Sequence, residues 1–360
     1  MNQRKEFVMH ASPKVLQLLG RHTIVGYHDL EELKTLVQKG AVGWVFISQR
    51  NLRGKTFEQM QLEIESLQEI QKQAGRDPLF IATDQEGGLV SKLSPLLTHL
   101  PPLSQVLEDR PSTEQLAFRV KDYASTQAKE LFDLGINVNF APVVDLKNEH
   151  PKDFIDTHSL LDLRSISSNP QEVSQVTKYY LEAYNEFGVI PTLKHFPGMG
   201  RIQQDTHFKS GILNLSKQEL QEKDWLPFKE NLSPSKAWIM MGHTQITAID
   251  AHELADLSPK VIQGLIRGEW QHEGVLISDD FSMGPVYSRN GGVGVAAVDA
   301  LNAGLDMILI SYDPDLYYEV MHGLIKAFEQ NQLHTAQLGK SEERLNQSRK
   351  YLTRHFLSLR

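Results

Sequence analysis

The sequence predicts an α/β protein, a single (β/α)8 barrel of the TIM type with additional C-terminal helices. Short apolar runs alternate with longer amphipathic segments along all 360 residues. The runs are almost uniformly apolar, which is typical of parallel strands that helices cover on both faces. Eight strand–helix pairs can be counted, the number that closes such a barrel. No linker rich in proline, serine or glycine divides the chain, so we expect one domain over residues 1–360.

The expected strands are short and buried. A run such as Val42–Ser48 has no polar face, so it suits the inside of a covered sheet rather than its edge. In chain order, the expected strands are His22–Tyr27, Val42–Ser48, Leu79–Thr83, Val138–Val144, Val189–Leu193, Ala237–Met241, Val275–Ser278 and Met307–Ile310.

The expected helices lie between these runs. Within Thr56–Gln73, for example, Met60, Ile64 and Leu67 recur near the 3.6-residue period of an amphipathic helix. Ser258 is placed to cap the helix that follows it. The expected helices are Asp29–Lys39, Thr56–Gln73, Thr113–Leu134, Pro170–Phe187, Ser216–Asn231, Pro259–Trp270, Val293–Ala303, Pro314–Gln330 and Thr335–His355.

A doubly wound open sheet is the alternative fold for the same alternation. Such sheets often carry a G-x-G-x-x-G turn between a strand and a helix. No strand here is followed by that pattern, and Gly198-Met199-Gly200 lacks its third glycine. The barrel is therefore the favoured interpretation.

Composition narrows the class of protein. The formal net charge is −8 and no Lys/Arg cluster stands out, which argues against nucleic acid or an anionic membrane as a partner. Cysteine is absent, so disulfides and thiolate metal sites are excluded. Neither a signal peptide over Met1–Gly20 nor a membrane span is apparent. We expect a cytoplasmic protein and favour a monomer.

Polar residues gather at the strand ends. In a barrel these ends meet at the carboxyl-terminal face, where catalytic groups sit. An isolated Asp after a strand often only caps a helix, but lysine and histidine do not cap helices in this way. The sequence therefore predicts an active site on this face. The residues at the strand ends are Asp84-Gln85-Glu86, Asp145, Lys194-His195, His243, Asp279-Asp280 and Asp313.

The stretch Lys194–His207 is the densest of these: it combines cations, histidines and a carboxylate with two glycines. Glycoside hydrolysis, which needs a nucleophilic carboxylate and a proton donor, suits such residues. Metal-assisted hydrolysis is the alternative if His195, His207, His243 and Asp279 converge. No His-x-His or His-Glu-x-x-His motif supports it. We expect no metal and no cofactor.

Five stretches, in the same order along the chain, carry a family pattern. They are Asp84–Val90, Asn139–Asp145, Arg164-Ser165, Lys194–Gly200 with Asp205-Thr206-His207, and Ser278–Met283. Together they resemble family-3 glycoside hydrolases, in the β-N-acetylglucosaminidase branch. The resemblance spans Leu79 to Met283. It implies exo-acting hydrolysis of terminal β-linked N-acetylglucosamine, with small oligosaccharides or muropeptides as substrates and a role in peptidoglycan recycling.

The resemblance also implies residue roles. Asp279 would be the nucleophile that forms a covalent glycosyl-enzyme with retention, and Asp205 and His207 the acid/base dyad. The implied substrate-binding residues are Asp84, Arg164, Lys194 and His195, with Lys92 and His243 as further candidates. We interpret Asp280 as a turn or barrel contact and Glu86 as a structural partner in the barrel mouth.

Elementary chemistry agrees with the proposed dyad. A histidine can replace the usual carboxylic acid because its pKa lies near neutrality. Asp205, two residues before His207, is placed to accept the imidazole N–H. We expect Gly198 and Gly200 to let this loop swing over a bound sugar, and Arg201 to be solvated.

Three positions depart from the family pattern: Met199 and Leu89 stand where histidine and arginine are usual, and Ile166 where phenylalanine is usual. They affect the expected substrate preference more than the reaction type. The alternatives left open are a family-3 β-glucosidase, a glycosyl phosphorylase or transferase, and a non-catalytic glycan-binding relative.

Overall fold

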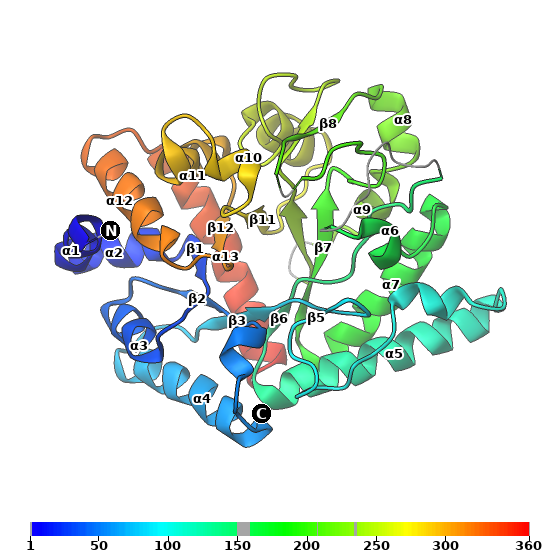
Figure 1. Cartoon of the computed structure of the whole chain (residues 1–360), viewed down its shortest axis with the longest axis horizontal. Coiled ribbons are helices and arrows are strands. Elements are labelled where there is room, and N and C mark those ends of the chain that lie inside the picture. Colours follow the sequence, from blue (N-terminus) through cyan, green and yellow to red (C-terminus); the bar gives the residue numbers. More distant parts are fainter. Residues whose placement is uncertain (1, 150–158, 207, 234–235, 360) are drawn as a thin grey trace.

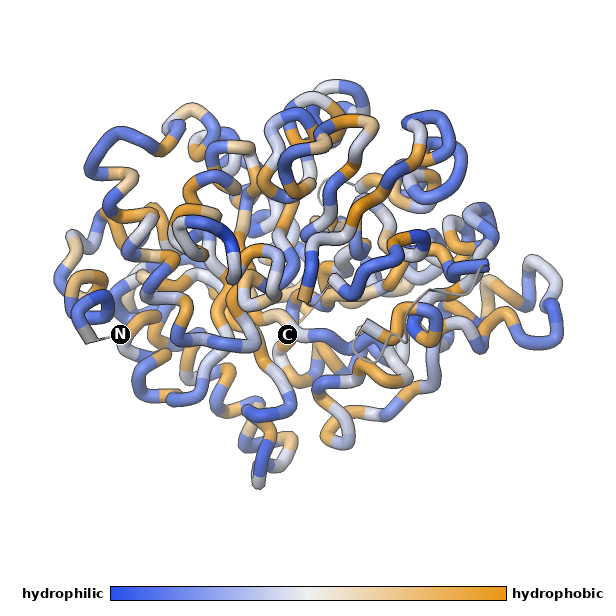
Figure 2. The backbone as a smooth tube through the Cα atoms, turned by 45° about the horizontal axis from the view of Figure 1, so that its top comes forward, coloured by the Kyte–Doolittle hydropathy of each residue, from blue (hydrophilic) through white to orange (hydrophobic). Residues whose placement is uncertain are grey.

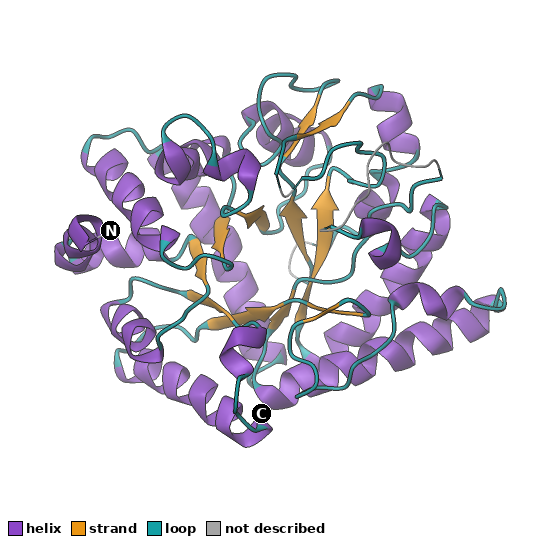
Figure 3. Cartoon of the chain, in the orientation of Figure 1, coloured by secondary structure: helices purple, strands orange, loops and turns teal. Residues whose placement is uncertain are grey.

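The computed structural model, which describes residues 2–149, 159–206, 208–233 and 236–359, is a closed barrel of eight parallel strands surrounded by helices (Figures 1 and 3). The predicted fold class is confirmed. Around the barrel the strands run β1-β12-β11-β9-β7-β6-β3-β2. Their bounds are β1 Thr23–Val25, β2 Trp44–Phe46, β3 Phe80–Thr83, β6 Val138–Asn139, β7 Ile190–Phe196, β9 Trp238–Met241, β11 Leu276–Asp280 and β12 Met307–Ile310.

Two strands extend beyond their predicted ends, and both carry polar residues of the predicted site. β7 continues through Lys194 and His195 to Phe196, and its register against β9 shifts between Leu193 and Phe196. β11 continues to Asp280. These polar side chains therefore project from strands held on both sides by hydrogen bonds, which position them more rigidly than a loop would.

Most helices match their predicted ranges. The helices of the barrel units and the C-terminal helix are α3 Leu30–Lys39, α4 Phe57–Gln73, α5 Thr113–Leu134, α7 Pro170–Phe187, α8 Lys217–Glu222, α9 Leu226–Glu230, η3 Lys260–Glu269, α11 Gly292–Ala303, α12 Leu316–Glu329 and α13 Thr335–His355.

Two of these helices differ from the prediction. The single helix expected over Ser216–Asn231 is wrong: the chain breaks at Lys223, whose ψ of −85° does not continue a helix, and α8 and α9 are separate. η3 is a π-helix, in which the Trp270 N–H reaches back five residues to the Leu265 carbonyl. The predicted Ser258 cap is confirmed, since its Oγ accepts from the Val261 N–H at 3.3 Å.

The amino-terminal end of the barrel is closed by aromatic rings and by α13. Trp44 stacks on Phe80 with ring centroids 3.7 Å apart, and Trp238 packs edge-on at 5.2 Å from Trp44. From α13, Ser348 accepts the indole N–H of Trp238 at 3.2 Å. Apolar segments concentrate in this interior and polar segments in the outer loops (Figure 2). The polar residues Lys194, His195 and Asp280 lie at the opposite, carboxyl-terminal ends of the strands.

Several short elements, none longer than nine residues, were not predicted from the sequence. Two small sheets stand out: the β4–β5 hairpin after β3, and β8 paired with β10. Their bounds, with those of the other short elements, are α1 Asn2–His10, α2 Pro13–Gly20, η1 Gln49–Leu52, β4 Gln85–Gly87, β5 Val90–Ser91, η2 Leu103–Leu107, α6 Leu161–Arg164, β8 Gly211–Leu213, β10 Thr244–Ile246 and α10 Gly284–Tyr287. Within the described ranges, no helix combines the length and apolarity that a membrane crossing requires.

Candidate active site

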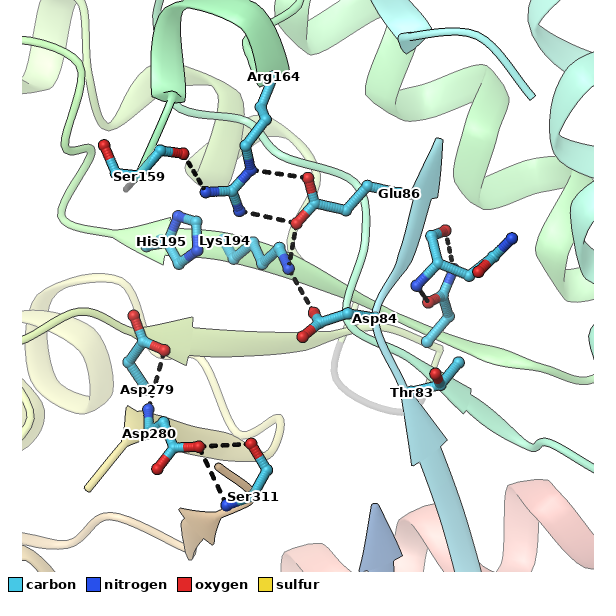
Figure 4. Close-up of polar contacts among 12 residues, drawn as sticks. Thr83, Asp84, Glu86, Ser159, Arg164, Lys194, His195, Asp279, Asp280 and Ser311 are labelled. Atoms are coloured by element: carbon cyan, nitrogen blue, oxygen red, sulfur yellow. Dashed lines mark hydrogen bonds and ion pairs between the residues drawn. The ribbon is translucent and has the colours of Figure 1, made fainter. Parts of the chain in front are cut away.

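Four charged side chains from three separate segments of the chain meet in the barrel mouth (Figure 4). The Lys194 Nζ on β7 lies 2.7 Å from Asp84 Oδ1 and 2.6 Å from Glu86 Oε1. Arg164, at the end of α6, donates from Nε and Nη2 to the two Glu86 oxygens at 2.9 and 2.7 Å. Its Nη1 donates to the Ser159 carbonyl at 2.9 Å. The predicted binding residues Asp84, Arg164 and Lys194 are thus brought together, with Glu86 as their common partner.

Glu86 is ionised because of its two cations. Burial alone would raise its pKa, but Arg164 and Lys194 lower the pKa of Glu86 to about 2. Burial likewise opposes the charge on Lys194, yet Asp84 and Glu86 raise the Lys194 pKa. Asp84 is the member of the cluster open to solvent, with 22% of its side chain exposed. These contacts support the interpretation of Glu86 as a structural partner. The Asp84 carboxylate is the one in the cluster that is partly open to solvent.

His195 is oriented by a carboxylate that the sequence did not mark for any role. Asp145, fully buried after β6, accepts from the His195 backbone N–H at 3.0 Å and lies 2.7 Å from its Nδ1. The other Asp145 oxygen accepts from the Met199 N–H at 2.7 Å. This arrangement leaves Nε2 as the ring nitrogen of His195 that is directed away from Asp145. Asp145 was noted only as a strand-end residue.

The neighbours Asp279 and Asp280 have different environments. Asp280 is buried, and its oxygens accept backbone N–H groups of Ser282 at 2.9 Å, Ser311 at 3.0 Å and Tyr312 at 2.8 Å. This agrees with its interpretation as a turn and barrel contact. Asp279 remains partly exposed beside it. Burial would raise the pKa of Asp279, but the charges of His195 and His243 lower it. Asp279 is therefore an ionised carboxylate that stays partly exposed at the end of β11.

His243 lies in the interior next to this pair. Its Nδ1 is 2.9 Å from Asp256 Oδ2, and its Nε2 is 3.0 Å from the Asp280 carbonyl oxygen. Both acceptors require a ring that carries two protons. Burial would lower the pKa of His243, but Asp256 raises it to about 9. Both nitrogens are engaged inside the protein, so the geometry gives His243 an electrostatic position beside Asp279 rather than the sugar contact predicted for it.

This buried imidazolium predicts a pH dependence of stability. Because the pKa of His243 is raised to about 9 from an ordinary 6.5, its stabilisation is complete below pH 6.5 and is lost as the pH rises through 9. The shift corresponds to about 3 kcal/mol of unfolding free energy. Urea unfolding between pH 6.5 and 10 measures it. The His243→Gln variant should lack this part of the decline, and parallel pH curves for the two proteins would contradict the assignment.

Comparison with known proteins identifies the family. The model of "Glycosyl hydrolase family 3 N terminal domain" matches residues 12–347. The chain belongs to glycosyl hydrolase family 3. A beta-hexosaminidase of Stenotrophomonas maltophilia K279a is 32% identical over 303 residues, 84% of each chain. Beta-hexosaminidase LpqI of Mycobacterium tuberculosis is 30% identical over 301 residues, 82% of this chain and 72% of its own.

Solved structures of this family have the same fold as this chain. A family-3 β-N-acetylglucosaminidase of Paenibacillus sp. FPU-7 superposes with a TM-score of 0.82 at 28% identity, covering 93% of this chain and 62% of its own. The chain thus spans less than two thirds of that solved protein. LpqI of M. tuberculosis superposes at 0.79 and 26% identity, with 95% of both chains covered. The family, the branch and the glycoside hydrolase class expected from the sequence are confirmed.

In this family-3 hydrolase the glycines of the Lys194–His207 stretch are closely packed. A Cβ on Gly200 would lie 1.8 Å from the Leu146 carbonyl oxygen, and one on Gly198, where φ is +97°, would lie 2.8 Å from the Asp224 Cβ. Met199 between them is buried, with 5% exposed. Close packing at both positions, and the positive φ at Gly198, require glycine here. The swing of this loop over a bound sugar stays a prediction.

Arg201 is also not the solvated residue expected. Its Nε lies 3.1 Å from Asp224 Oδ2, and its Nη2 contacts the same carboxylate. Asp224 is buried at the start of the turn between α8 and α9, so this pair ties the family motif to the helical layer. No pattern of residue spacing in the sequence indicated the Arg201–Asp224 ion pair.

The remaining predicted residues are Lys92, Asp205 and His207. Lys92 is exposed beside β5, and among the described residues its side chain has no hydrogen bond or ion pair to the cluster of Asp84, Glu86, Arg164 and Lys194. The Asp205 carbonyl accepts from the N–H groups of Phe208 and Lys209, which places it in a turn. His207 lies outside the described residues. No group of three or more potential metal ligands forms in the described part of the chain.

Proposed function

We propose that this hydrolase is a retaining, exo-acting β-N-acetylglucosaminidase in which Asp279 is the nucleophile. The observation that carries the proposal is the partly exposed Asp279 at the end of β11, kept ionised by His195 and His243. Its attack on the anomeric carbon would form a glycosyl-enzyme, and water would then displace Asp279. Two inversions give net retention.

Sugar binding is assigned to the residues around Asp84. The Asp84 carboxylate faces solvent beside Lys194, so it offers an acceptor to sugar hydroxyls while Lys194 offers a donor. His195, oriented by Asp145, contributes its free Nε2. Arg164 retains N–H groups beyond those used on Glu86 and Ser159. Lys92 remains a proposed peripheral contact.

Asp205 and His207 are proposed as the acid/base dyad. His207 would protonate the leaving oxygen and then deprotonate water, with Asp205 orienting the ring. The support is the family motif and their spacing of two residues. The branch to which the relatives belong favours N-acetylglucosamine as the sugar that is removed. We extend the proposal to peptidoglycan fragments as the substrates. We further propose that a single barrel domain carries out this step of peptidoglycan recycling in the cytoplasm.

Two aryl glycosides test the proposed function directly. The 4-nitrophenyl β-N-acetylglucosaminide should be hydrolysed with a much higher kcat/KM than the 4-nitrophenyl β-glucoside. Nuclear magnetic resonance of the first product should show the β-anomer before mutarotation. Faster glucoside cleavage would make the protein a β-glucosidase, and no turnover of either substrate would contradict an enzyme. Glycosyl phosphate formed in phosphate buffer would indicate a phosphorylase.

The His207→Ala variant tests the acid/base assignment. With the activated aryl substrate we expect kcat to fall about 10²-fold, because water loses its general base. Sodium azide, which needs no deprotonation, should restore turnover and yield the β-glycosyl azide. The control is His252→Ala, a histidine of the loop after β10. A His207→Ala enzyme that azide does not rescue, or that keeps wild-type activity, would refute the assignment.

A further inference from the structure

The segment that follows β6 runs alongside the end of β7. The Val144 N–H donates to the Lys194 carbonyl at 2.8 Å, and the Lys194 N–H donates to the Pro142 carbonyl at 3.3 Å. Asp145 is the next residue of this segment, and it meets His195, the next residue of β7. Backbone pairing between the two segments therefore fixes where the Asp145 side chain lies.

Three N–H groups converge on the Asp145 carboxylate. Its Oδ2 accepts from the His195 backbone N–H at 3.0 Å and lies 2.7 Å from the His195 Nδ1. Its Oδ1 accepts from the Met199 N–H at 2.7 Å. A carboxylate can only accept hydrogen bonds, so the His195 Nδ1 must carry a proton. Both oxygens are occupied and the side chain is fully buried, which holds the carboxylate in one orientation.

The two oxygens of Asp145 bind different parts of the chain. His195 belongs to β7, whose backbone is paired on both sides in the barrel. Met199 lies beyond the end of β7, in the loop that leads to Asp205. One buried carboxylate therefore sets the position of the strand end relative to the beginning of this loop.

His195 also lies near the proposed nucleophile (Figure 4). Burial raises the pKa of Asp279, and the charge of His195 is the first of those that lower it. The charges of His243 and Lys194 act in the same direction. A change in the orientation or the protonation of the His195 ring would therefore be felt at Asp279.

We infer that Asp145 is a positioning residue for the reaction. Through His195 it orients the ring that is assigned to sugar binding and that neighbours Asp279, and through the Met199 N–H it anchors the loop that leads to the proposed acid/base pair. The inference rests on the proposed function, because it concerns the same site. It makes a carboxylate at position 145 necessary for full activity, although this group is buried away from the substrate.

An amide of the same shape cannot replace this carboxylate. Asparagine has one acceptor oxygen, and its NH2 group is a donor. If the amide oxygen faces His195, the NH2 group meets the Met199 N–H. If the oxygen faces Met199, the NH2 group meets the His195 backbone N–H. Either orientation of Asp145→Asn places two donors against each other, so one of the two anchored segments must shift.

Steady-state kinetics test the inference. Asp145→Asn should lower kcat/KM for 4-nitrophenyl β-N-acetylglucosaminide about 10²-fold, because small displacements of groups that position the substrate have effects of this size. When Asp145→Asn is combined with His195→Ala, the loss should exceed that of the worse single variant by no more than about threefold, since the two residues act together. Losses that multiply, or wild-type kcat/KM in Asp145→Asn, would overturn the inference.

Asp224→Asn is the matched control. Asp224 is another buried carboxylate beneath the same loop: it lies 3.1 Å from the Arg201 Nε, and a Cβ on Gly198 would lie 2.8 Å from its Cβ. Within the described residues it forms no hydrogen bond to His195. The variant should be less stable in urea, as Asp145→Asn should be, yet keep kcat/KM within about fivefold. Equal losses of kcat/KM in the two variants would mean that loop packing alone matters, and would overturn the role of Asp145 through His195.

Nuclear magnetic resonance of protein labelled with 15N-histidine provides a signature that packing alone would not change. The His195 Nδ1 proton, bonded to a carboxylate, should resonate at low field, and His195→Ala identifies the signal by its disappearance. The signal should move or vanish in Asp145→Asn and stay in Asp224→Asn. A wild-type His195 that carries its proton only on Nε2 would overturn the inference, even if Asp145→Asn does not fold.

Failure of the proposed function is distinguishable. If wild type cleaves no N-acetylglucosaminide, calorimetric titration with N-acetylglucosamine tests the positioning role alone. Binding that Asp145→Asn weakens about tenfold and that Asp224→Asn leaves unchanged would uphold the role of Asp145 without the reaction. Equal affinity in the three proteins, or no binding to wild type, would overturn it.

Discussion

The Asp279→Asn variant is expected to lose activity by on the order of 10³-fold or more in kcat, because an amide cannot form the glycosyl-enzyme. Folding should be preserved. Asparagine keeps the side-chain oxygen that accepts the Asp280 N–H at 2.8 Å. Circular dichroism and urea unfolding check this point while steady-state kinetics with the aryl substrate measure the loss.

The neighbouring carboxylate provides the control. Asp280→Asn changes the same chemical group one residue along, but Asp280 is turned toward Ser311 and Tyr312 and holds the loop after β12. We expect it to lower stability and to affect kcat far less than Asp279→Asn does. A 5-fluoro glycosyl fluoride should label wild type at Asp279, as mass spectrometry of peptides would show. Label on Asp280, or more than a tenth of activity left in Asp279→Asn, would contradict the assignment.

The Glu86→Gln variant is expected to lose about 3–5 kcal/mol of unfolding free energy, because it leaves Arg164 and Lys194 buried with an uncompensated charge. The pKa of Glu86, lowered to about 2, implies that this stabilisation is present above pH 4.5 and disappears as the pH falls through 2. Urea unfolding at neutral pH measures the loss. kcat/KM should fall as well, since Lys194 and Arg164 would lose the carboxylate that they share and that positions both.

Asp306→Asn is a matched control from the other end of the barrel. Asp306 is also a buried carboxylate between two arginines: Arg267 lies 2.9 Å away and Arg344 2.8 Å away. It precedes β12, opposite the proposed site, so the variant should lose stability while the folded enzyme keeps its KM. A Glu86→Gln protein within 1 kcal/mol of wild type, or one with unchanged KM, would show that the cluster is not organised by Glu86.

The order of the motifs along the chain was enough to predict which charged side chains lie at the carboxyl-terminal face of the barrel. Asp84, Lys194, His195 and Asp279 were identified because each follows or ends an apolar run, and parallel strands of a barrel bring their carboxyl ends to one face. The longer helices were predicted from the 3.6-residue spacing of their apolar side chains. Periodicity failed over 216–231 because a turn between two helices of 6 and 5 residues leaves the apolar spacing unchanged.

By itself, then, the sequence determined the barrel, the face that carries the site and the family, since these follow from local patterns within a few residues. Only the tertiary structure decided the partners. Lys194 and Asp84 are 110 residues apart, and Arg164 and Glu86 are 78 apart. Neither pairing leaves a trace in local spacing. The same holds for the environments within a motif. Asp279 and Asp280 have the same side chain, but Asp279 is partly exposed while Asp280 accepts the backbone N–H groups of Ser311 and Tyr312 in the loop after β12.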